Sequence, residues 1–200
     1  MPSCKCYLSH STFASKRSSA RFSCNMRPTT LTSIIPLAEI DPQLVEALLD
    51  AAFGSDRHNR TAYKLRDGMD MLEGLSLAAV DLEKHELLGS IQCWPVALTD
   101  EDGQKHPMIM VGPVAVYPDF QREGIGRAMM TALLKEIQPD DPLPLVMIGD
   151  PEYYERFFGF TAEGTAGWTL PGPWEPSRLL VRSNPAHPLP KTGTLGPWTQ

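Results

Sequence analysis

A short glycine-containing loop constrains this chain more than any other feature. Its six residues, Gln121-Arg122-Glu123-Gly124-Ile125-Gly126, follow an apolar run and precede a segment with apolar residues at helical spacing. Glycines allow the backbone to turn sharply there and to approach a ligand closely. The free N–H groups of the first helical turn, and the positive end of the helix dipole, then face that ligand. The loop therefore predicts a site for an anion, above all a phosphate.

Three kinds of phosphate site can be compared with this loop. A nucleotide-binding P-loop ends in Gly-Lys-Ser/Thr, which is missing here. A dinucleotide fingerprint needs Gly or Ala at its third position, where this chain has Met129. The third is a site for the pyrophosphate of coenzyme A, with Arg122 and Arg127 adding charge at its rim. A tight turn without a ligand is the alternative that the glycines alone leave open.

The elements around the loop predict an α/β domain. Apolar runs indicate strands at 31–37, 75–80, 87–96, 108–117, 143–148 and 178–182. Capping signals and helical spacing indicate helices at 42–53, 59–66, 125–137 and 151–158. Gly112-Pro113 predicts a bulge or an edge within its strand, and Pro95 should confine its strand near the end. Three consecutive strands favour a mixed, mostly antiparallel sheet of about six or seven strands flanked by about four helices.

The 200 residues divide into three segments by composition. Residues 1–27 contain seven serines, five basic residues and no acidic one, and they lack periodicity. We interpret them as a disordered or non-native extension, although their composition has some transit-peptide character. Residues 28–183 form the predicted domain. Residues 184–200 are predicted to be a loose, Pro-rich tail.

The charge and the cysteine content of the chain limit the classes of partner and the cellular compartment that the sequence predicts. Beyond residue 27 the chain has 24 acidic residues against 13 of its 18 basic ones, which argues against nucleic acid and is compatible with an amine. No apolar run approaches the roughly 18 residues of a membrane helix. Of four cysteines only Cys93 lies in the domain, which indicates a reducing cytoplasm. Cys4, Cys6 and His10 fit no common zinc spacing, so no metal is expected.

Two motifs in order resemble one family. The segment GPVAVYPDFQREGIGRAMM (112–130) resembles the acetyl-CoA-binding segment of the GCN5-related N-acetyltransferase (GNAT) superfamily. Its motif, Arg/Gln-x-x-Gly-x-Gly/Ala, is filled here by Gln121, Gly124 and Gly126. The segment VMIGDPEYYERFFGF (146–160) resembles the second conserved region, in which a Tyr precedes a Gly-Phe pair. Trp94-Pro95-Val96 and residues 149–154 resemble, more narrowly, YhbS-like bacterial acetyltransferases.

The resemblance implies an acetyltransferase fold over residues 31–182 and acetyl-CoA as co-substrate. The acetyl group would pass directly to a primary amine of a small molecule or peptide, without an acyl-enzyme. The main chain of three residues would pair with the pantetheine arm, and one of their N–H groups could stabilise the oxyanion: Val114, Ala115 and Val116. The loop would hold the pyrophosphate through Gln121, Arg122, Glu123, Gly124, Ile125, Gly126 and Arg127.

The resemblance also implies a catalytic tyrosine. Tyr154 is the candidate that protonates the leaving thiolate, with Tyr153 second. Family members usually have four residues' separation between this Tyr and the Gly of Gly-Phe. Here the separation is five, which a π-bulge or a register shift would absorb. The strand before the loop contains no acid, so no general base is named.

Other functions stay open at this point. The missing acid and the shifted tyrosine favour an acyl-CoA sensor without chemistry as the alternative. A partner-binding or nucleic-acid-binding role of the basic N-terminal tail is a third hypothesis. The sequence leaves the oligomeric state open, a homodimer included. The predicted second helix has a basic run, which we interpret as a solvated face bordering the acceptor cleft: Arg57, His58, Arg60, Lys64 and Arg66, with Tyr63 among them.

Overall fold

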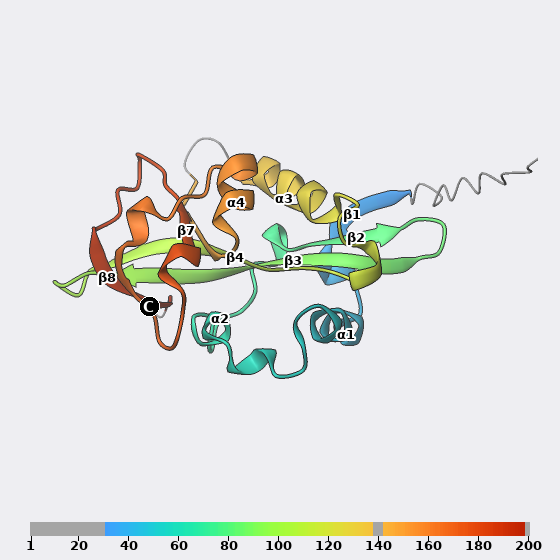
Figure 1. Cartoon of the computed structure of the whole chain (residues 1–200), viewed down its shortest axis with the longest axis horizontal. Helices are drawn as coiled ribbons and strands as arrows, with labels where there is room; N and C mark the ends of the chain where they lie inside the picture. The colour runs from blue at the N-terminus through green and yellow to red at the C-terminus, as the bar shows by residue number, and fades with distance from the viewer. Residues whose placement is uncertain (1–30, 138–141, 199–200) are drawn as a thin grey trace, which may run out of the picture.

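A computed structural model describes residues 31–137 and 142–198, so the predicted extension at 1–27 lies outside the described residues. Eight strands and four α-helices follow one another in the described part of the chain (Figure 1). The strands are β1 Thr32–Pro36, β2 Leu77–Asp81, β3 Glu86–Thr99, β4 Lys105–Val116, β5 Leu145–Ile148, β6 Gly167–Thr169, β7 Leu179–Arg182 and β8 Thr192–Pro197. The α-helices are α1 Pro42–Phe53, α2 Thr61–Lys64, α3 Ile125–Glu136 and α4 Pro151–Phe158.

All eight strands belong to one mixed sheet. Its main path runs β1-β2-β3-β4-β5-β7, and β8 pairs with both β3 and β6. Only the β4–β5 and β6–β8 pairs are parallel. The predicted mixed, mostly antiparallel α/β fold is therefore confirmed. The two strands that no predicted range covers are β6 and β8, which are short and rich in glycine and threonine rather than in apolar residues.

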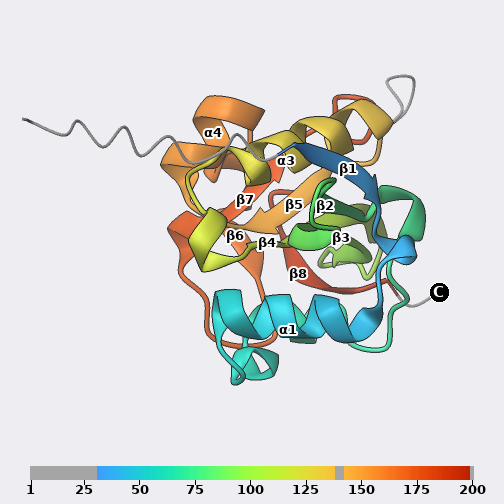
Figure 2. The same ribbon diagram turned by 90° about the vertical axis from the view of Figure 1, so that its right-hand side faces the viewer.

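Helices cover both faces of this sheet. In Figure 1, α3 and α4 lie on one face and α1 and α2 on the other, and Figure 2 shows the strands between the two layers. The α3 and α4 side packs on the largest cluster of buried apolar residues, which includes Ile91, Met129 and Phe160. The opposite side has one cluster under α1 and another under α2 and the C-terminal strands. No helix of the described residues is long and apolar enough to cross a membrane.

Two Asp-Pro pairs start helices as predicted. The Asp41 carboxylate accepts a hydrogen bond from the N–H of Gln43 at 2.8 Å, at the first turn of α1. The Asp150 carboxylate does the same for the N–H of Glu152 at 3.0 Å, at the first turn of α4. Proline follows each cap, where its fixed φ suits a helix and its missing N–H breaks no bond.

The predicted helix at 59–66 is shorter in the structure. One 3-10 turn spans Arg57–Asn59, and α2 is a single turn, Thr61–Lys64. The basic run therefore curls across the sheet instead of presenting one solvated face. Two of its members are buried, Arg57 and Arg66, with 2% and 8% of their surface exposed. The expectation of a solvated face is therefore wrong for these two residues. The spacing of residues in the sequence predicts a regular helix, and it does not predict a short turn that brings a basic side chain into the core.

Two strand expectations also need correction. β3 does not stop near Pro95 but continues to Thr99. β2 pairs with β3 only as far as Ile91, and β8 only from Val96, so Pro95 lies between these partners, where a missing N–H disturbs neither ladder. The loose tail expected at 184–200 contains β8, whose Leu195 is fully buried opposite Leu98. Because β8 has a single buried apolar residue, its sequence lacks the alternation of apolar and polar residues that predicts a strand.

Candidate active site

The bulge predicted at Gly112-Pro113 interrupts β4. Ile91 of β3 lies opposite Val114, and Cys93 lies opposite Val111, so Gln92 alone faces two residues of β4. The peptide bond between Gly112 and Pro113 is cis, and Gly112 has a φ of 136°. The extra residue reverses the alternation of β4. Met110 faces the α2 side before the bulge, and after it Ala115 faces the same side.

β4 and β5 separate close to this bulge. Their parallel pairing is limited to Ile109 with Leu145 and Met110 with Val146. Further along, β5 pairs only with β7, while β4 keeps only β3 as its partner among the described strands. Residues 112–116 of β4 therefore have an edge that no described strand covers. Backbone N–H and C=O groups on that edge, apart from the Val116 carbonyl, are free to bind an extended ligand.

The glycine loop lies at the end of the same strand. The Gln121 side chain donates a hydrogen bond from Nε2 to the Val116 carbonyl at 3.3 Å, which ties the loop to β4. Arg122 and Gly124 both have positive φ, 69° and 85°, whereas Glu123 between them does not. Such an alternation of φ turns successive N–H groups toward one side, as in the backbone nests that bind anions in other proteins. Gly124 is also the N-cap of α3 and leaves the first N–H groups of the helix uncapped by any side chain.

Gly126 leaves room beside the loop. A Cβ built at this residue would lie 3.8 Å from the nearest atom, Cγ2 of Val116, which is ordinary contact. Nothing in the protein itself therefore demands glycine there. A groove of about 520 Å³ runs from the loop along α3 and is lined by Gly124, Arg127, Ala128, Thr131, Ala132, Lys135 and Glu136. Two of the predicted loop residues, Gly124 and Arg127, are thus part of the lining of this groove.

Tyr154 lies at the other side of the opening, just after β5. A Cβ at Gly149 would come within 2.7 Å of the Tyr154 ring, so glycine at the end of β5 allows the ring to pack there. Its hydroxyl has no hydrogen-bond partner among the described residues. Burial, with smaller contributions from Tyr153 and the charge of Asp150, raises the pKa of Tyr154 to about 12. The phenol is therefore protonated, and able to donate, at neutral pH.

The end of α4 bears on the unusual spacing between Tyr154 and Gly159. The N–H of Gly159 bonds the carbonyls of both Glu155 and Tyr154, and the second bond has the i to i−5 spacing of a π-turn, so the extra residue is taken up at the C-terminal end of the helix. Phe157 lies on the exposed side, with the Arg127 guanidinium 4.6 Å above its ring. Tyr153 packs edge-on against Tyr154, and burial raises its pKa as well, opposed by the charge of Arg127.

Comparison with known proteins decides the family. Residues 33–161 match the family described as an acetyltransferase (GNAT) domain, which is more than half of the chain. The chain belongs to the GNAT family. It is 29% identical over 118 residues to the N-acetyltransferase YhbS of Escherichia coli strain K12, a stretch that covers 59% of this chain and 67% of that protein. The chain is thus an N-acetyltransferase by family, as its two motifs indicated.

Solved GNAT structures agree with this assignment. The crystal structure of Escherichia coli YhbS in complex with CoA superposes with a TM-score of 0.65 at 25% identity, covering 82% of this chain and 88% of that one. A GNAT acetyltransferase from Brucella melitensis in complex with acetyl-CoA superposes with a TM-score of 0.56 at 22% identity, covering 84% and 96%. The expected GNAT fold is confirmed, and these structural neighbours hold CoA or acetyl-CoA.

Other candidate groups of the GNAT domain are inert or absent. Cys93 is fully buried in β3, and burial raises the pKa of its thiol to about 12, so it is a packed strand residue and not a nucleophile. The described residues contain no group of three or more His, Cys, Asp or Glu that could hold a metal ion. Cys4, Cys6 and His10 lie outside the described residues. β4 carries no acidic residue.

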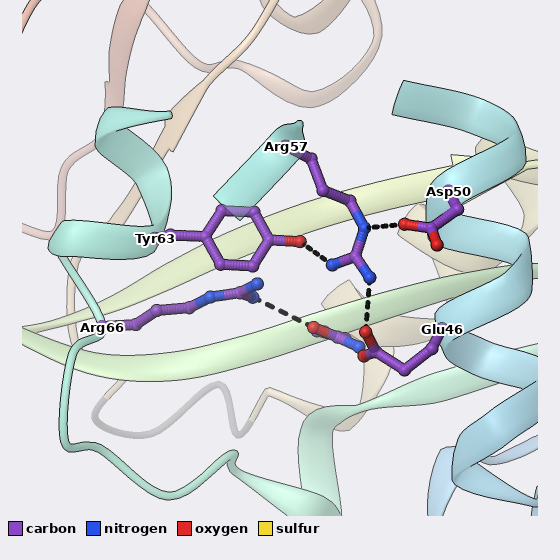
Figure 3. Close-up of polar contacts among 6 residues, drawn as sticks. Glu46, Asp50, Arg57, Tyr63 and Arg66 are labelled. Atoms are coloured by element: carbon purple, nitrogen blue, oxygen red, sulfur yellow. Dashed lines mark hydrogen bonds and ion pairs between the residues drawn. The ribbon is translucent and has the colours of Figure 1, made fainter. Parts of the chain in front are cut away.

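Sequence reasoning missed a polar cluster on the α1 and α2 side of the GNAT sheet. Arg57 donates from Nε to Asp50 at 2.7 Å and from its other nitrogens to Glu46 and the Tyr63 hydroxyl (Figure 3). Burial by itself lowers the pKa of Arg57, but these three hydrogen bonds raise it, and the net pKa lies above its usual value. Arg57 therefore fastens the turn after α1 to α1 itself.

A second buried arginine lies beside the first. Arg66 donates from Nη1 to Oε1 of Gln92 at 3.0 Å, and burial lowers the pKa of its guanidinium against the opposing effect of Tyr63. Figure 3 shows Arg66 reaching toward α1 over the sheet. One sequence signal existed for this contact. Gln92 is a polar residue within an otherwise apolar strand, and buried polar groups need partners.

Proposed function

We propose that this protein transfers the acetyl group of acetyl-CoA to a primary amine of a small molecule or peptide. The observation that carries the proposal is the free edge of β4 next to the nest before α3. An extended pantetheine arm needs unpaired strand groups, and a pyrophosphate needs converging N–H groups. Membership of the GNAT family supports acetyl transfer as the reaction.

The residues present fit the cofactor. Val114, Ala115 and Val116 lie on the part of β4 beyond its pairing with β5, where they would pair with the pantetheine arm. The loop residues would hold the pyrophosphate through their backbone, in the order Gln121, Arg122, Glu123, Gly124, Ile125, Gly126 and Arg127. Acetyl-CoA supplies the activated thioester. An N–H of β4 would stabilise the negative charge that develops on the thioester oxygen.

Tyr154 is proposed as the proton donor, with Tyr153 second. The amine nitrogen bonds the acetyl carbon as the carbon–sulfur bond breaks, and the departing thiolate takes up a proton from the phenol. A raised pKa keeps that proton on Tyr154, and the absence of a described hydrogen-bond partner leaves the hydroxyl free to donate it. The amine loses its own proton to water in this scheme, because β4 offers no carboxylate, and water then returns a proton to the Tyr154 phenolate.

Acetyl-CoA binding by matched Gly126 variants tests the site. Gly126→Trp should fold, since a Cβ fits there, but its ring would block the approach of a ligand to the loop. Gly126→Ala is the control, because the motif accepts alanine. A ligand at 100 times its Kd stabilises the folded state by about 2.7 kcal/mol. We expect a melting shift of several degrees for the wild type and Gly126→Ala. An equal shift in a folded Gly126→Trp variant would refute this site.

An acyl-CoA sensor is the second candidate function. The lack of an acid in β4 and the longer spacing from Tyr154 to Gly159 favour it. Release of CoA in the presence of a panel of amines separates the two. Amine-dependent release establishes the enzyme, whereas acetyl-CoA binding with no release above background for any amine favours the sensor. The single cysteine of the domain supports a cytoplasmic location for either function.

A further inference from the structure

Arg66 is a buried cation without a counter-charge of its own. Only 8% of its surface is exposed, and its guanidinium carbon lies 4.1 Å from the ring centroid of Tyr63 and 4.3 Å from that of Trp94. Those two half-buried rings occupy its faces, so the nitrogens at its edge are the part left for hydrogen bonds. One edge nitrogen donates to Gln92. In the described part of the chain no carboxylate lies within ion-pairing distance of Arg66.

The acidic side chains of this cluster form their ion pairs with Arg57 and not with Arg66. Glu46 and Asp50 both pair with Arg57, which donates one hydrogen bond to each (Figure 3). Glu46 is the acid that acts on Arg66 through its charge, and Arg57 acts on it as a repelling cation. Arg66 therefore holds a positive charge in a poorly solvated place with no bonded anion. Burying an unpaired charge is costly, which indicates that an anion completes the arrangement.

Unsatisfied polar atoms lie along the same face of β3. Ser90, Gln92 and Trp94 alternate with Ile91 and Cys93, so all three face the α1 and α2 side. Ser90 is fully buried, and neither its hydroxyl nor the indole N–H of Trp94 has a hydrogen-bond partner among the described residues. Such groups are rare in folded proteins unless something else bonds them. Together with Arg66 they form a row of donors.

This row lies at the point where β4 opens. Gln92, which holds Arg66, is the residue that faces the bulge at Gly112 and Pro113. Beyond that bulge lies the strand segment that we assign to the pantetheine arm. The donors face the α1 and α2 side, opposite to the side of α3 and α4. An acceptor that meets the thioester from this side would pass Arg66.

We propose that the acceptor amine carries a carboxylate, and that Arg66 binds this carboxylate while the indole N–H of Trp94, whose ring stacks on Arg66, adds a hydrogen bond. The substrate class is then that of amino acids or of peptides with an acidic group near the amine. A guanidinium with both faces stacked offers a carboxylate two parallel N–H donors. The inference rests on the proposed function, because it places the carboxylate next to the site of acetyl transfer.

Matched amine pairs test the inference. The probes are L-amino acids and their carboxamides, with spermidine and kanamycin as amines that have no carboxylate. CoA release at saturating acetyl-CoA is measured by chromatography. Hydrogen bonds to a charged group predict a kcat/KM at least about 10-fold higher for an acid than for its amide. Arg66→Met should abolish this preference by raising the KM of the acid, and leave the KM of acetyl-CoA unchanged.

Further variants and a binding arm keep the inference falsifiable. Arg66→Lys retains the charge but loses the two parallel N–H donors of the guanidinium. Its preference in kcat/KM for the acid over the amide should lie between those of the wild type and Arg66→Met. Arg182→Met, at an exposed arginine of β7, should behave as wild type. A thermal shift caused by the acids alone, lost in Arg66→Met and absent with the amides, supports carboxylate binding. The absence of a shift with acetyl-CoA would refute only the proposed function. Equal rates for acid and amide, or acetylation of spermidine and kanamycin alone, would overturn the carboxylate.

Discussion

The way in which a side chain of this protein is buried decides whether it can exchange a proton with a ligand. Tyr154 and Cys93 both have a pKa raised to about 12 by burial, but their surroundings differ. Cys93 is fully enclosed within the sheet, whereas Tyr154 is half-buried at the end of β5 beside the opening. The Tyr154 phenol keeps its proton at neutral pH and lies where a ligand can reach it, so it can act as a proton donor. The Cys93 thiol also keeps its proton, but no ligand reaches it, so it stays unreactive.

Tyr154→Phe tests the proposed acid. We expect kcat to fall by about 10²- to 10⁴-fold, the usual contribution of a positioned acid. The KM of acetyl-CoA should stay within a factor of two, on the order expected when no binding contact is lost. Tyr153→Phe is the matched control and should keep most of the rate. A reversed pattern would move the role to Tyr153.

The same tyrosine predicts an alkaline effect on stability. Its pKa is about 12 in the folded protein against 10.0 for the free side chain, so the folded state holds the proton more tightly. The stabilisation is complete below pH 10 and is lost as the pH rises toward 12. Urea unfolding at pH 9 and pH 11 should show a larger loss for the wild type than for Tyr154→Phe. Equal losses would contradict the raised pKa.

Cys93 should resist modification in the native state. Burial keeps its thiol protonated, and the thiolate is the reactive form. Iodoacetamide at pH 8 should leave the peptide around Cys93 unlabelled by mass spectrometry until urea unfolds the protein. Cys93 in the urea-unfolded protein provides the internal reference for complete labelling. Labelling of Cys93 in the folded protein would show that the strand is accessible.

Elements are positioned here by a few polar contacts that cross between them. The turn at Arg57–Asn59 is short, and Arg57 fixes it to α1 through two carboxylates and to α2 through the Tyr63 hydroxyl. The same contacts set Tyr63 over Arg66. A change at Arg57 therefore reaches the proposed acceptor side through the position of α2.

Arg57→Met tests this role. The methionine fills the space but leaves Tyr63, Glu46 and Asp50 without their donor. Breaking a buried ion pair costs about 3–5 kcal/mol, and the half-exposed carboxylates here regain water, so about 2–3 kcal/mol is expected. Thermal melts should show a drop of roughly 5–10 °C at this chain length. A melting temperature equal to that of the wild type would remove Arg57 as the fastening residue.

The sequence predicts some elements of this fold much better than others. The Asp-Pro caps, the bulge at Gly112-Pro113 and the helix after the glycine loop follow from local rules, and all are present. α2 and β8 do not follow from such rules, because each is held by distant contacts and not by its own periodicity. The burial of Arg66 depends on Trp94 and Gln92, which are far away in the sequence.

At the scale of the whole molecule, the C-terminal segment completes the sheet. β8 pairs with the far half of β3, which β2 does not reach, and it also holds β6. Leu195 of β8 packs in the cluster under α2, together with Leu65 and Val96. The residues that close the α2 side thus come from the middle and the end of the chain.

Leu195→Ala tests whether this segment belongs to the folded core. Removing a fully buried leucine costs about 2–5 kcal/mol, whereas a residue of a loose tail would cost under about 0.5 kcal/mol. Urea unfolding measures the difference, with the exposed Lys191→Ala as control. A loss for Leu195→Ala no larger than for Lys191→Ala would contradict the observed pairing of β8.

Hydrogen exchange with and without acetyl-CoA tests the central claim most directly, because it reports on the backbone groups that are proposed to bind. Bound ligand should slow exchange of the amides at Val114 and Val116 and in the loop 121–127. Amides of β8, on the far side of β3, should exchange at unchanged rates. Protection confined to these two segments would establish the opening of β4 and the nest as the acetyl-CoA site. Protection elsewhere, with both segments unchanged, would contradict the account.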